Sequence, residues 1–114
     1  METLNQKVEK LKNYIIGLKY LEAIDDLYHD NVEVYENHTL SCTGKSKYKE
    51  QGKAYMGGIS NYKAELLKTV IGDQTTACLW KYNFDHKERG PMNMQELSVQ
   101  QWKDGKIISE THFY

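Results

Sequence analysis

The stretch Thr75–Tyr114, TTACLWKYNFDHKERGPMNMQELSVQQWKDGKIISETHFY, decides the fold of this 114-residue chain. Apolar and polar residues alternate along three runs, which are Thr75 to His86, Met92 to Trp102 and Lys106 to Tyr114. A period of two is typical of β-strands. Glu88-Arg89-Gly90-Pro91 and Asp104-Gly105 separate the runs and contain residues favoured in tight turns. The stretch therefore predicts an antiparallel meander.

Upstream, Tyr62 to Ile71 and the turn Gly72-Asp73 add one more strand. Before that point the period becomes helical, with apolar residues three or four apart. The first helical stripe consists of Leu4, Val8, Leu11, Ile15 and Leu18, and the second of Leu21, Ile24, Leu27 and Tyr28. A third helix is predicted from Lys45 to Met56, where Gly57-Gly58 ends it.

Between the second and third helices, Val32 to Glu36 alternates as a short strand with Val32, Val34 and Glu36 on one face. Ser41 to Gly44 is predicted to be a loop with helix-capping residues. Helices followed by long strands are typical of an α+β domain rather than a parallel βαβ fold. At this length we expect one domain, residues 1–114.

The composition argues against several classes of protein. Fifteen basic and sixteen acidic residues are interspersed, which gives no footprint for nucleic acid or a membrane surface. No apolar run approaches a membrane span and no secretory signal is visible, so we expect a cytoplasmic location. Cys42 and Cys78 are far apart in sequence and are expected to be free buried thiols.

Several local motifs stand out along the chain, namely Asn13-Tyr14-x-x-x-Leu18, Leu27-Tyr28-x-Asp30-Asn31-Val32, Tyr35-Glu36-Asn37, Gly44-Lys45 and Trp102-x-Asp104-Gly105-Lys106-Ile107. In this order they resemble the nuclear transport factor 2-like superfamily, in particular its SnoaL-like and ketosteroid isomerase-like members. The resemblance implies a cone-shaped, cystatin-like roll, in which three N-terminal helices pack on a curved antiparallel sheet around a pocket. Ketosteroid isomerases use a tyrosine and two aspartates there, and Tyr14, Glu36 and Ser98 stand at the matching positions. Because Ser98 replaces a protonated aspartate, we expect steroid isomerisation to be slow or absent.

If the resemblance fixes the faces, alternation lines the pocket with aromatic walls and converging polar groups, as in a small-molecule site. The pocket-facing residues of the three last strands would be Trp80, Tyr82, Phe84 and His86, then Met94, Glu96, Ser98, Gln100 and Trp102, then Ile108, Glu110, His112 and Tyr114. The expected ligand-binding residues among them are Trp80, Tyr82, Glu96, Gln100, Trp102, Glu110 and Tyr114.

The expected catalytic residues are Tyr14, Glu36, Ser98 and His112, and each also has a structural interpretation. Glu36 is either a desolvated general base or a rim carboxylate paired with a lysine. Tyr14 is either a hydrogen-bond donor to an enolate or a core tyrosine. Glu110 and His112, two apart on one strand face, could orient each other as a base and its partner or, as the weaker alternative, help to hold a metal. No metal and no cofactor are expected.

On the opposite face of the sheet the same alternation leaves six apolar residues, namely Ala77, Leu79, Leu97, Val99, Ile107 and Phe113. Such a patch indicates a homodimer joined through the convex sheet face. The functional hypothesis is an isomerase, cyclase or dehydratase that transfers protons next to a carbonyl of an unknown small molecule. The alternative is a non-catalytic binding or scaffold domain.

Overall fold

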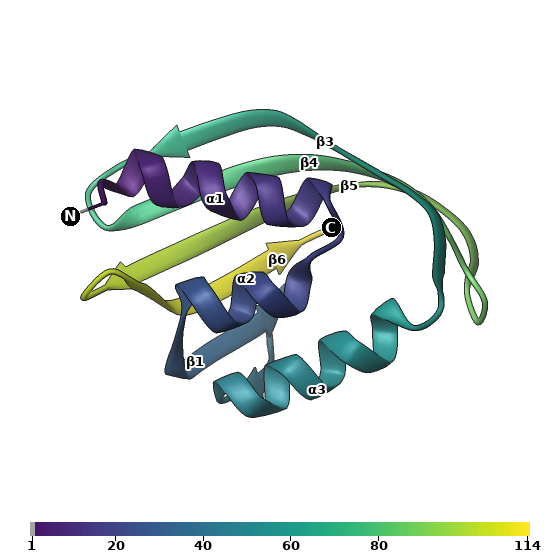
Figure 1. Cartoon of the computed structure of the whole chain (residues 1–114), viewed down its shortest axis with the longest axis horizontal. Coiled ribbons are helices and arrows are strands. Elements are labelled where there is room, and N and C mark those ends of the chain that lie inside the picture. Colours follow the sequence, from purple (N-terminus) through teal and green to yellow (C-terminus); the bar gives the residue numbers. More distant parts are fainter. Residues whose placement is uncertain (1) are drawn as a thin grey trace.

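The computed structural model describes residues 2–114, which form a helical layer on a curved sheet (Figure 1). The elements in chain order are α1 (Leu4–Ile16), α2 (Tyr20–Leu27), β1 (Tyr28–Glu36), β2 (Thr39–Thr43), α3 (Lys45–Met56), β3 (Ile59–Ile71), β4 (Thr75–His86), β5 (Gly90–Lys103) and β6 (Lys106–Phe113). None of these helices is both long and apolar enough to cross a lipid bilayer. The predicted α+β order is thus confirmed.

The strands form one six-stranded sheet in the order β2-β1-β6-β5-β4-β3. Every neighbouring pair is antiparallel except β1 and β6, which run parallel. The long strands β3, β4 and β5 bend over the helices, so the sheet curves around its helical filling (Figure 1). The last strand, β6, consequently lies in the middle of the sheet, between the first strand and the meander.

The core lies between the helices and the concave face of the sheet. Helix α1 contributes Val8, Leu11 and Ile15, and α2 contributes Ala23, Ile24 and Leu27. The sheet meets them with Val32, Val34, Cys78, Trp80, Tyr82, Phe84, Trp102 and Ile107. Helix α3 differs, because none of its residues is fully buried. It lies against the rest of the fold as a covering element with a mostly polar surface.

Two predicted elements are corrected by the structure. Ser41–Gly44 was expected to be a loop, but Thr39–Thr43 forms strand β2, antiparallel to β1. Its serine and threonines suggested capping, yet an edge strand that buries only Cys42 tolerates such polar residues. The helical stripe was also extended too far, because Tyr28 is the first residue of β1 and Leu18 lies beyond the end of α1.

The predicted position of Ile107 on the convex face is wrong. Ile107 is fully buried in the core and pairs with Trp102 across β5 and β6. The register shifts between Gln101 and Trp102, so that Ile107 and Glu110, three residues apart, both point inward. Strict alternation counted back from the inward Glu110 places Ile107 on the wrong face for this reason.

Gly58, just after α3, packs closely against the ring of His86 at the end of β4. The His86 ring is fixed by a 3.1 Å contact from Nε2 to the Tyr55 carbonyl and by the Glu88 N–H, which donates to Nδ1 at 3.2 Å. A Cβ atom on Gly58 would lie 2.8 Å from two atoms of this ring. Only glycine fits here without moving a held side chain.

Replacing Gly58 by alanine should therefore lower the free energy of unfolding by about 1–3 kcal/mol, as overpacking does in other cores. Urea titration followed by tryptophan fluorescence measures the change. Gly57→Ala is the matched control, because a Cβ there meets only two carbonyl oxygens at 3.6 Å. Equal losses in the two variants would contradict this explanation.

Candidate functional site

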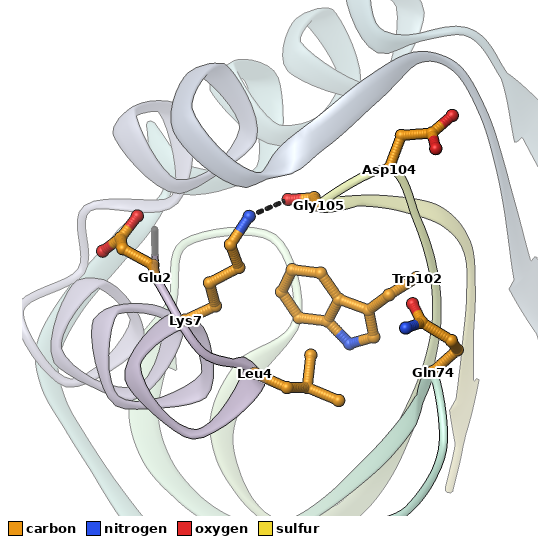
Figure 2. A pocket seen from close by; sticks show the side chains of 7 residues that line it. All are labelled: Glu2, Leu4, Lys7, Gln74, Trp102, Asp104 and Gly105. Atoms are coloured by element: carbon orange, nitrogen blue, oxygen red, sulfur yellow. Dashed lines mark hydrogen bonds between the residues drawn. The ribbon is translucent and has the colours of Figure 1, made fainter.

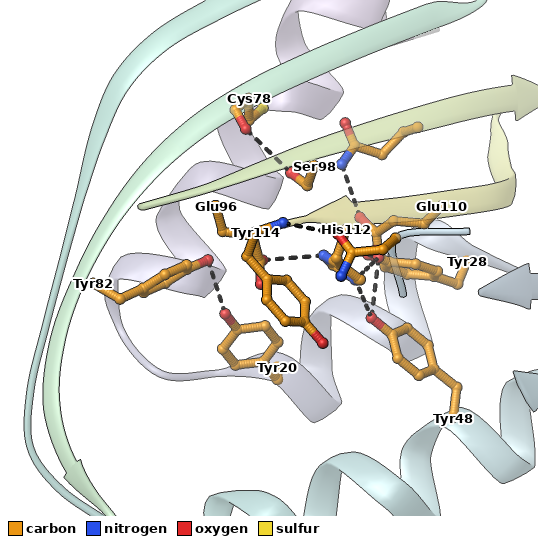
Figure 3. Close-up of polar contacts among 12 residues, drawn as sticks. Tyr20, Tyr28, Tyr48, Cys78, Tyr82, Glu96, Ser98, Glu110, His112 and Tyr114 are labelled. Carbon is orange, nitrogen blue, oxygen red and sulfur yellow. Dashed lines mark hydrogen bonds and ion pairs between the residues drawn. The ribbon is translucent and has the colours of Figure 1, made fainter. Parts of the chain in front are cut away.

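Glu110 is a buried carboxylate in the middle of the sheet and accepts hydrogen bonds from three neighbouring elements. Its Oε1 accepts from the Tyr28 hydroxyl at 2.5 Å and from the Tyr48 hydroxyl at 3.0 Å. Its Oε2 accepts from the Gln100 amide at 2.8 Å. Figure 3 shows the phenol of Tyr48 reaching from α3 toward this point. Only 2% of Glu110 is exposed, so protein groups replace the water that an ion needs.

The surroundings of Glu110 favour its charged form. Burial by itself would raise the pKa of Glu110, but the charge of His112 and the hydrogen bonds from His112, Tyr28 and Gln100 together hold that pKa below its ordinary value. Burial and the Glu110 charge also raise the pKa values of Tyr28 and Tyr48 far above the ordinary one. Both phenols therefore stay protonated and donate to the carboxylate.

His112 lies between two carboxylates. Its Nε2 is 3.3 Å from Glu110 Oε1 and its Nδ1 is 3.1 Å from Glu96 Oε1. Burial would lower the pKa of His112, but the charge of Glu110 and the hydrogen bonds that the ring donates to both carboxylates raise it well above the ordinary value. These contacts favour the charged form of the ring. We call Tyr28, Tyr48, Gln100, Glu110 and His112 the Glu110 cluster.

Glu36 is the neighbour of His112 on the other side. The two residues pair in the parallel register of β1 and β6, at the ends of both strands. Burial raises the pKa of the half-buried Glu36, and the nearby positive charge of His112 offsets part of that rise. Glu36 therefore combines partial desolvation with access to solvent, and its raised pKa makes it a better proton acceptor than an ordinary surface carboxylate.

An aromatic wall stands next to the cluster. The Tyr20 and Tyr82 hydroxyls are 3.1 Å apart (Figure 3), and the Tyr82 ring stacks on Trp80 with centroids 5.8 Å apart. Tyr62 also contacts Tyr82, at a centroid distance of 6.3 Å. The indole nitrogen of Trp80 is buried and finds no hydrogen-bond acceptor among residues 2–114.

Tyr14 and Glu36, both expected as catalytic residues of one pocket, do not meet in the structure. The Tyr14 hydroxyl donates to Asp26 at 2.9 Å, and the Asp26 carbonyl accepts from Lys106 at the beginning of β6. Glu36 instead pairs with His112, which is six residues beyond Lys106 and so about 20 Å further along the strand. Tyr14 points away from the site because of the helical period. Ile15 occupies the inward position of α1, so the preceding residue, Tyr14, faces α2.

The other expected residues occupy varied places. Ser98 is buried, and its hydroxyl contacts the Cys78 carbonyl at 3.5 Å (Figure 3). Trp80 and Trp102 lie in the core, Gln100 belongs to the Glu110 cluster, and Glu96 contacts the cluster through His112. Tyr114 is 63% exposed and lies near Glu36 at the end of the sheet.

Reasoning from the sequence missed the tyrosines that complete the site. Tyr20, Tyr28 and Tyr48 were read as helical positions or not singled out, yet all three hydroxyls meet site residues. The one signal was the excess of tyrosine, nine against two phenylalanines, which indicated an interior with polar tips. Nothing in the periodicity says which of the nine reach the carboxylates.

Two surface hollows lie away from this cluster. The first, of about 460 Å³, is lined by Glu2, Leu4, Lys7, Gln74, Trp102, Asp104 and Gly105, and Figure 2 shows Lys7 bonded to the Gly105 carbonyl across it. The second, of about 440 Å³, lies on α2 and α3 between Leu21, Ser46, Lys49, Glu50 and Lys53. Neither is lined by a residue of the Glu110 cluster.

The geometry supplies an acid and a base on adjacent strands. A fixed imidazolium can stabilise negative charge that develops on an oxygen, and a partly desolvated carboxylate can take a proton from carbon. The deeper carboxylate, Glu110, keeps the imidazole protonated. Such a set needs no group beyond the side chains present to move protons.

Comparisons with solved structures agree with this fold. A protein from Mesorhizobium loti, described as a SnoaL-like polyketide cyclase, superposes with a TM-score of 0.84 at 18% identity, covering 99% of this chain and all of the other. A polyketide cyclase of the same type from Agrobacterium tumefaciens gives 0.77 at 18% identity, covering 98% and 91%. A ketosteroid isomerase-like protein from Catenulispora acidiphila, bound to trimethylamine, gives 0.79 at 13% identity, covering 98% and 87%.

These identities show a shared fold. No curated protein matches the sequence significantly. The family model for the SnoaL-like domain, however, matches residues 3–114, which is nearly the whole chain. Together with the helices on a curved, mostly antiparallel sheet, this match shows that the chain belongs to the SnoaL-like domain family.

Proposed function

We propose that this chain is a cofactor-independent isomerase, cyclase or dehydratase that moves a proton next to a carbonyl group. The observation that carries the proposal is the pairing of half-buried Glu36, whose pKa is raised, with the charged ring of His112. In this proposal Glu36 is the general base and His112 stabilises the resulting enolate. His112 thus takes the part first expected of Tyr14.

The reaction begins when Glu36 removes a proton from the carbon next to the carbonyl. The electron pair of that C–H bond moves toward the carbonyl oxygen, which gains negative charge. Glu36 then returns the proton at another carbon in an isomerisation, or to a leaving hydroxyl in a dehydration. In a cyclisation the enolate carbon attacks a second carbonyl of the same substrate, the C=O π bond breaks, and the resulting alkoxide takes the proton from Glu36. No further reactant is needed in any of the three cases, and a dehydration releases one water as its product.

His112 faces the developing oxyanion with a full charge. Its Nδ1–H points at Glu96, whose side chain is 17% exposed, whereas Nε2 points at the deeply buried Glu110. A substrate oxygen that takes the place of Glu96 at Nδ1 would receive this hydrogen bond. Donors fixed before the reaction stabilise such oxygens well, because little reorganisation is needed.

The descriptions of several similar structures support an isomerase or cyclase reaction. The Mesorhizobium and Agrobacterium proteins are described as polyketide cyclases, and another similar structure, from Rhodopseudomonas palustris, is described as an isomerase. Polyketides contain repeated carbonyl groups, so cyclisation by proton abstraction fits the same chemistry. Ser98 already uses its hydroxyl on a backbone carbonyl, which agrees with the expectation that steroid isomerisation is slow or absent.

The second candidate is a binding domain without catalysis. It is favoured by the packed phenols of Tyr20, Tyr62 and Tyr82 beside the cluster, and by two hollows that both lie elsewhere. The Catenulispora relative, which holds trimethylamine, offers a small amine as the kind of ligand to test. Binding without proton transfer is the result that this candidate predicts.

The base role of Glu36 can be tested by hydrogen–deuterium exchange at carbon. Cyclic ketones, small oxo acids and a 3-oxo steroid are incubated with the protein in D₂O, and NMR follows loss of the proton signal next to the carbonyl. We expect the wild-type protein to accelerate exchange of a compact ketone or oxo acid, and Glu36→Gln to reduce that rate by about 100-fold or more.

Glu33→Gln is the matched control, because Glu33 is an exposed residue of the same strand. It should exchange the substrate at the wild-type rate. Undiminished exchange by Glu36→Gln would disprove the base assignment. Thermal stabilisation by trimethylamine, with no exchange of any carbonyl compound, would favour the binding domain instead.

We further propose that two copies associate through the convex face of the sheet. Apolar side chains follow the cross-strand pairs there: Val70 opposite Ala77, Ala77 opposite Val99, Leu79 opposite Leu97, and Leu97 opposite Phe113. Val70 is 58% exposed and Leu97 37% exposed. A second copy suits this patch, because a two-fold axis sets the same apolar rows against one another.

Val99→Glu should convert such a dimer into a monomer, because two carboxylates would be buried near the axis without partners. Sedimentation velocity at micromolar concentration measures the change. Asn93→Glu, six residues away on the same strand face, is the control and should leave the dimer intact. A wild-type monomer would contradict the proposal, and so would a Val99→Glu dimer.

A further inference from the structure

A line of hydrogen bonds runs through the core to Glu110 from a residue that is not part of the cluster. The Trp102 indole N–H donates to Thr76 Oγ1 at 2.9 Å. Thr76 Oγ1 donates to Gln100 Oε1 at 2.7 Å. Gln100 Nε2 then donates to Glu110 Oε2 at 2.8 Å. All four residues are at least 96% buried, so water does not compete for these bonds.

The chemistry of the first donor fixes the direction of the whole line. An indole nitrogen can only donate a hydrogen bond, so the Thr76 oxygen must be the acceptor in that contact. The single hydroxyl proton of Thr76 is then donated to Gln100. That proton is received by the amide oxygen of Gln100, which turns the NH₂ group toward Glu110. The orientation of this amide is therefore determined by its partners.

We propose that Trp102, Thr76 and Gln100 are positioning residues, whose one-way line of hydrogen bonds holds Glu110 as an anion and thereby keeps the His112 ring charged. A reversed Gln100 amide would present its oxygen to Glu110 Oε2. Two acceptors would then face each other, and the carboxyl group would have to take up a proton to donate between them. His112 would lose its deeper counter-charge as a result.

The inference rests on the proposed function, because it explains how the enolate-stabilising cation is maintained. The other groups that face His112 are Glu96 on β5, Glu36 on β1 and Tyr48 on α3, and Tyr114 after β6 contacts Glu36. Of the carboxylates near His112, Glu96 and Glu36 are more exposed to solvent than Glu110. Glu36 also loses its negative charge whenever it accepts a proton as the base. Glu110 is the one carboxylate whose charge the core itself can hold constant.

The test is an NMR titration of the histidine rings in ¹⁵N-labelled protein, with His112 assigned from its loss in His112→Asn. In the wild-type protein His112 should stay charged well above the ordinary range. Thr76→Val keeps the shape but removes the hydroxyl, and should lower the midpoint of the His112 titration by about one pH unit or more. Thr76→Ser keeps the hydroxyl and should restore the wild-type midpoint.

The chain offers a matched control on the other face of the same strand. Thr75 donates to Gln101 Oε1 at 2.8 Å, the exposed counterpart of the Thr76–Gln100 bond. Thr75→Val should leave the His112 midpoint unchanged. A folded Thr76→Val protein with the wild-type midpoint would overturn the inference, and so would an equal shift in Thr75→Val.

If Thr76→Val does not fold, Gln100→Met decides the question, since it removes the donor to Glu110 at similar length. A folded Gln100→Met protein should show the same lowered midpoint, and a wild-type midpoint would overturn the inference. The titration needs no substrate. Absence of carbon exchange in the wild-type protein would therefore contradict the proposed function while leaving this inference to be judged by the His112 midpoint alone.

Discussion

A buried carboxylate needs several donors, and Glu110 obtains them from four elements of the fold. Tyr28 comes from β1, Tyr48 from α3, Gln100 from β5 and His112 from β6 itself. An ion removed from water without such partners would cost several kcal/mol. The relative placement of these four elements is therefore constrained by one side chain. Helix α3 depends on it strongly, because none of its residues is fully buried and Tyr48 supplies its side-chain hydrogen bond to the interior of the sheet, beside the backbone contact of the Tyr55 carbonyl with His86.

The carboxylates of the site differ in how deeply they are buried, and this difference decides how well each charge is stabilised. Glu110 is enclosed by donors and its charge is stabilised, whereas Glu36 is half buried and its charge is disfavoured. His112 lies between them and stays protonated. Two carboxylates on neighbouring strands thus acquire different properties through their environments alone, which is how proteins separate the roles of chemically identical groups. A base and a fixed cation are obtained without any residue of unusual chemistry.

The element order and nearly all strand positions could be predicted from the sequence, because period two and period 3.6 differ clearly over long runs. Local exceptions could not. The register shift beside Trp102 places Ile107 inside, and only the pairing of β5 with β6 reveals it. Tyr14 failed as a site residue because one helical step separates it from the inward Ile15. Glu110 and His112 were correctly predicted to orient each other, since they are neighbours on one face of one strand. The phenols of Tyr28 and Tyr48 come from distant elements, and no local pattern encodes such meetings.

The central place of β6 has a consequence for the order in which the molecule assembles. The hairpin of β1 and β2 and the meander of β3, β4 and β5 are each formed by strands adjacent in sequence, but only β6 joins them. This joining closes a loop of about seventy residues between β1 and β6, a slow and entropically costly step. Because β6 also carries Glu110 and His112, the two halves cannot unite without inserting an ion pair between them. We therefore expect completion of the sheet and creation of the charged centre to coincide in folding.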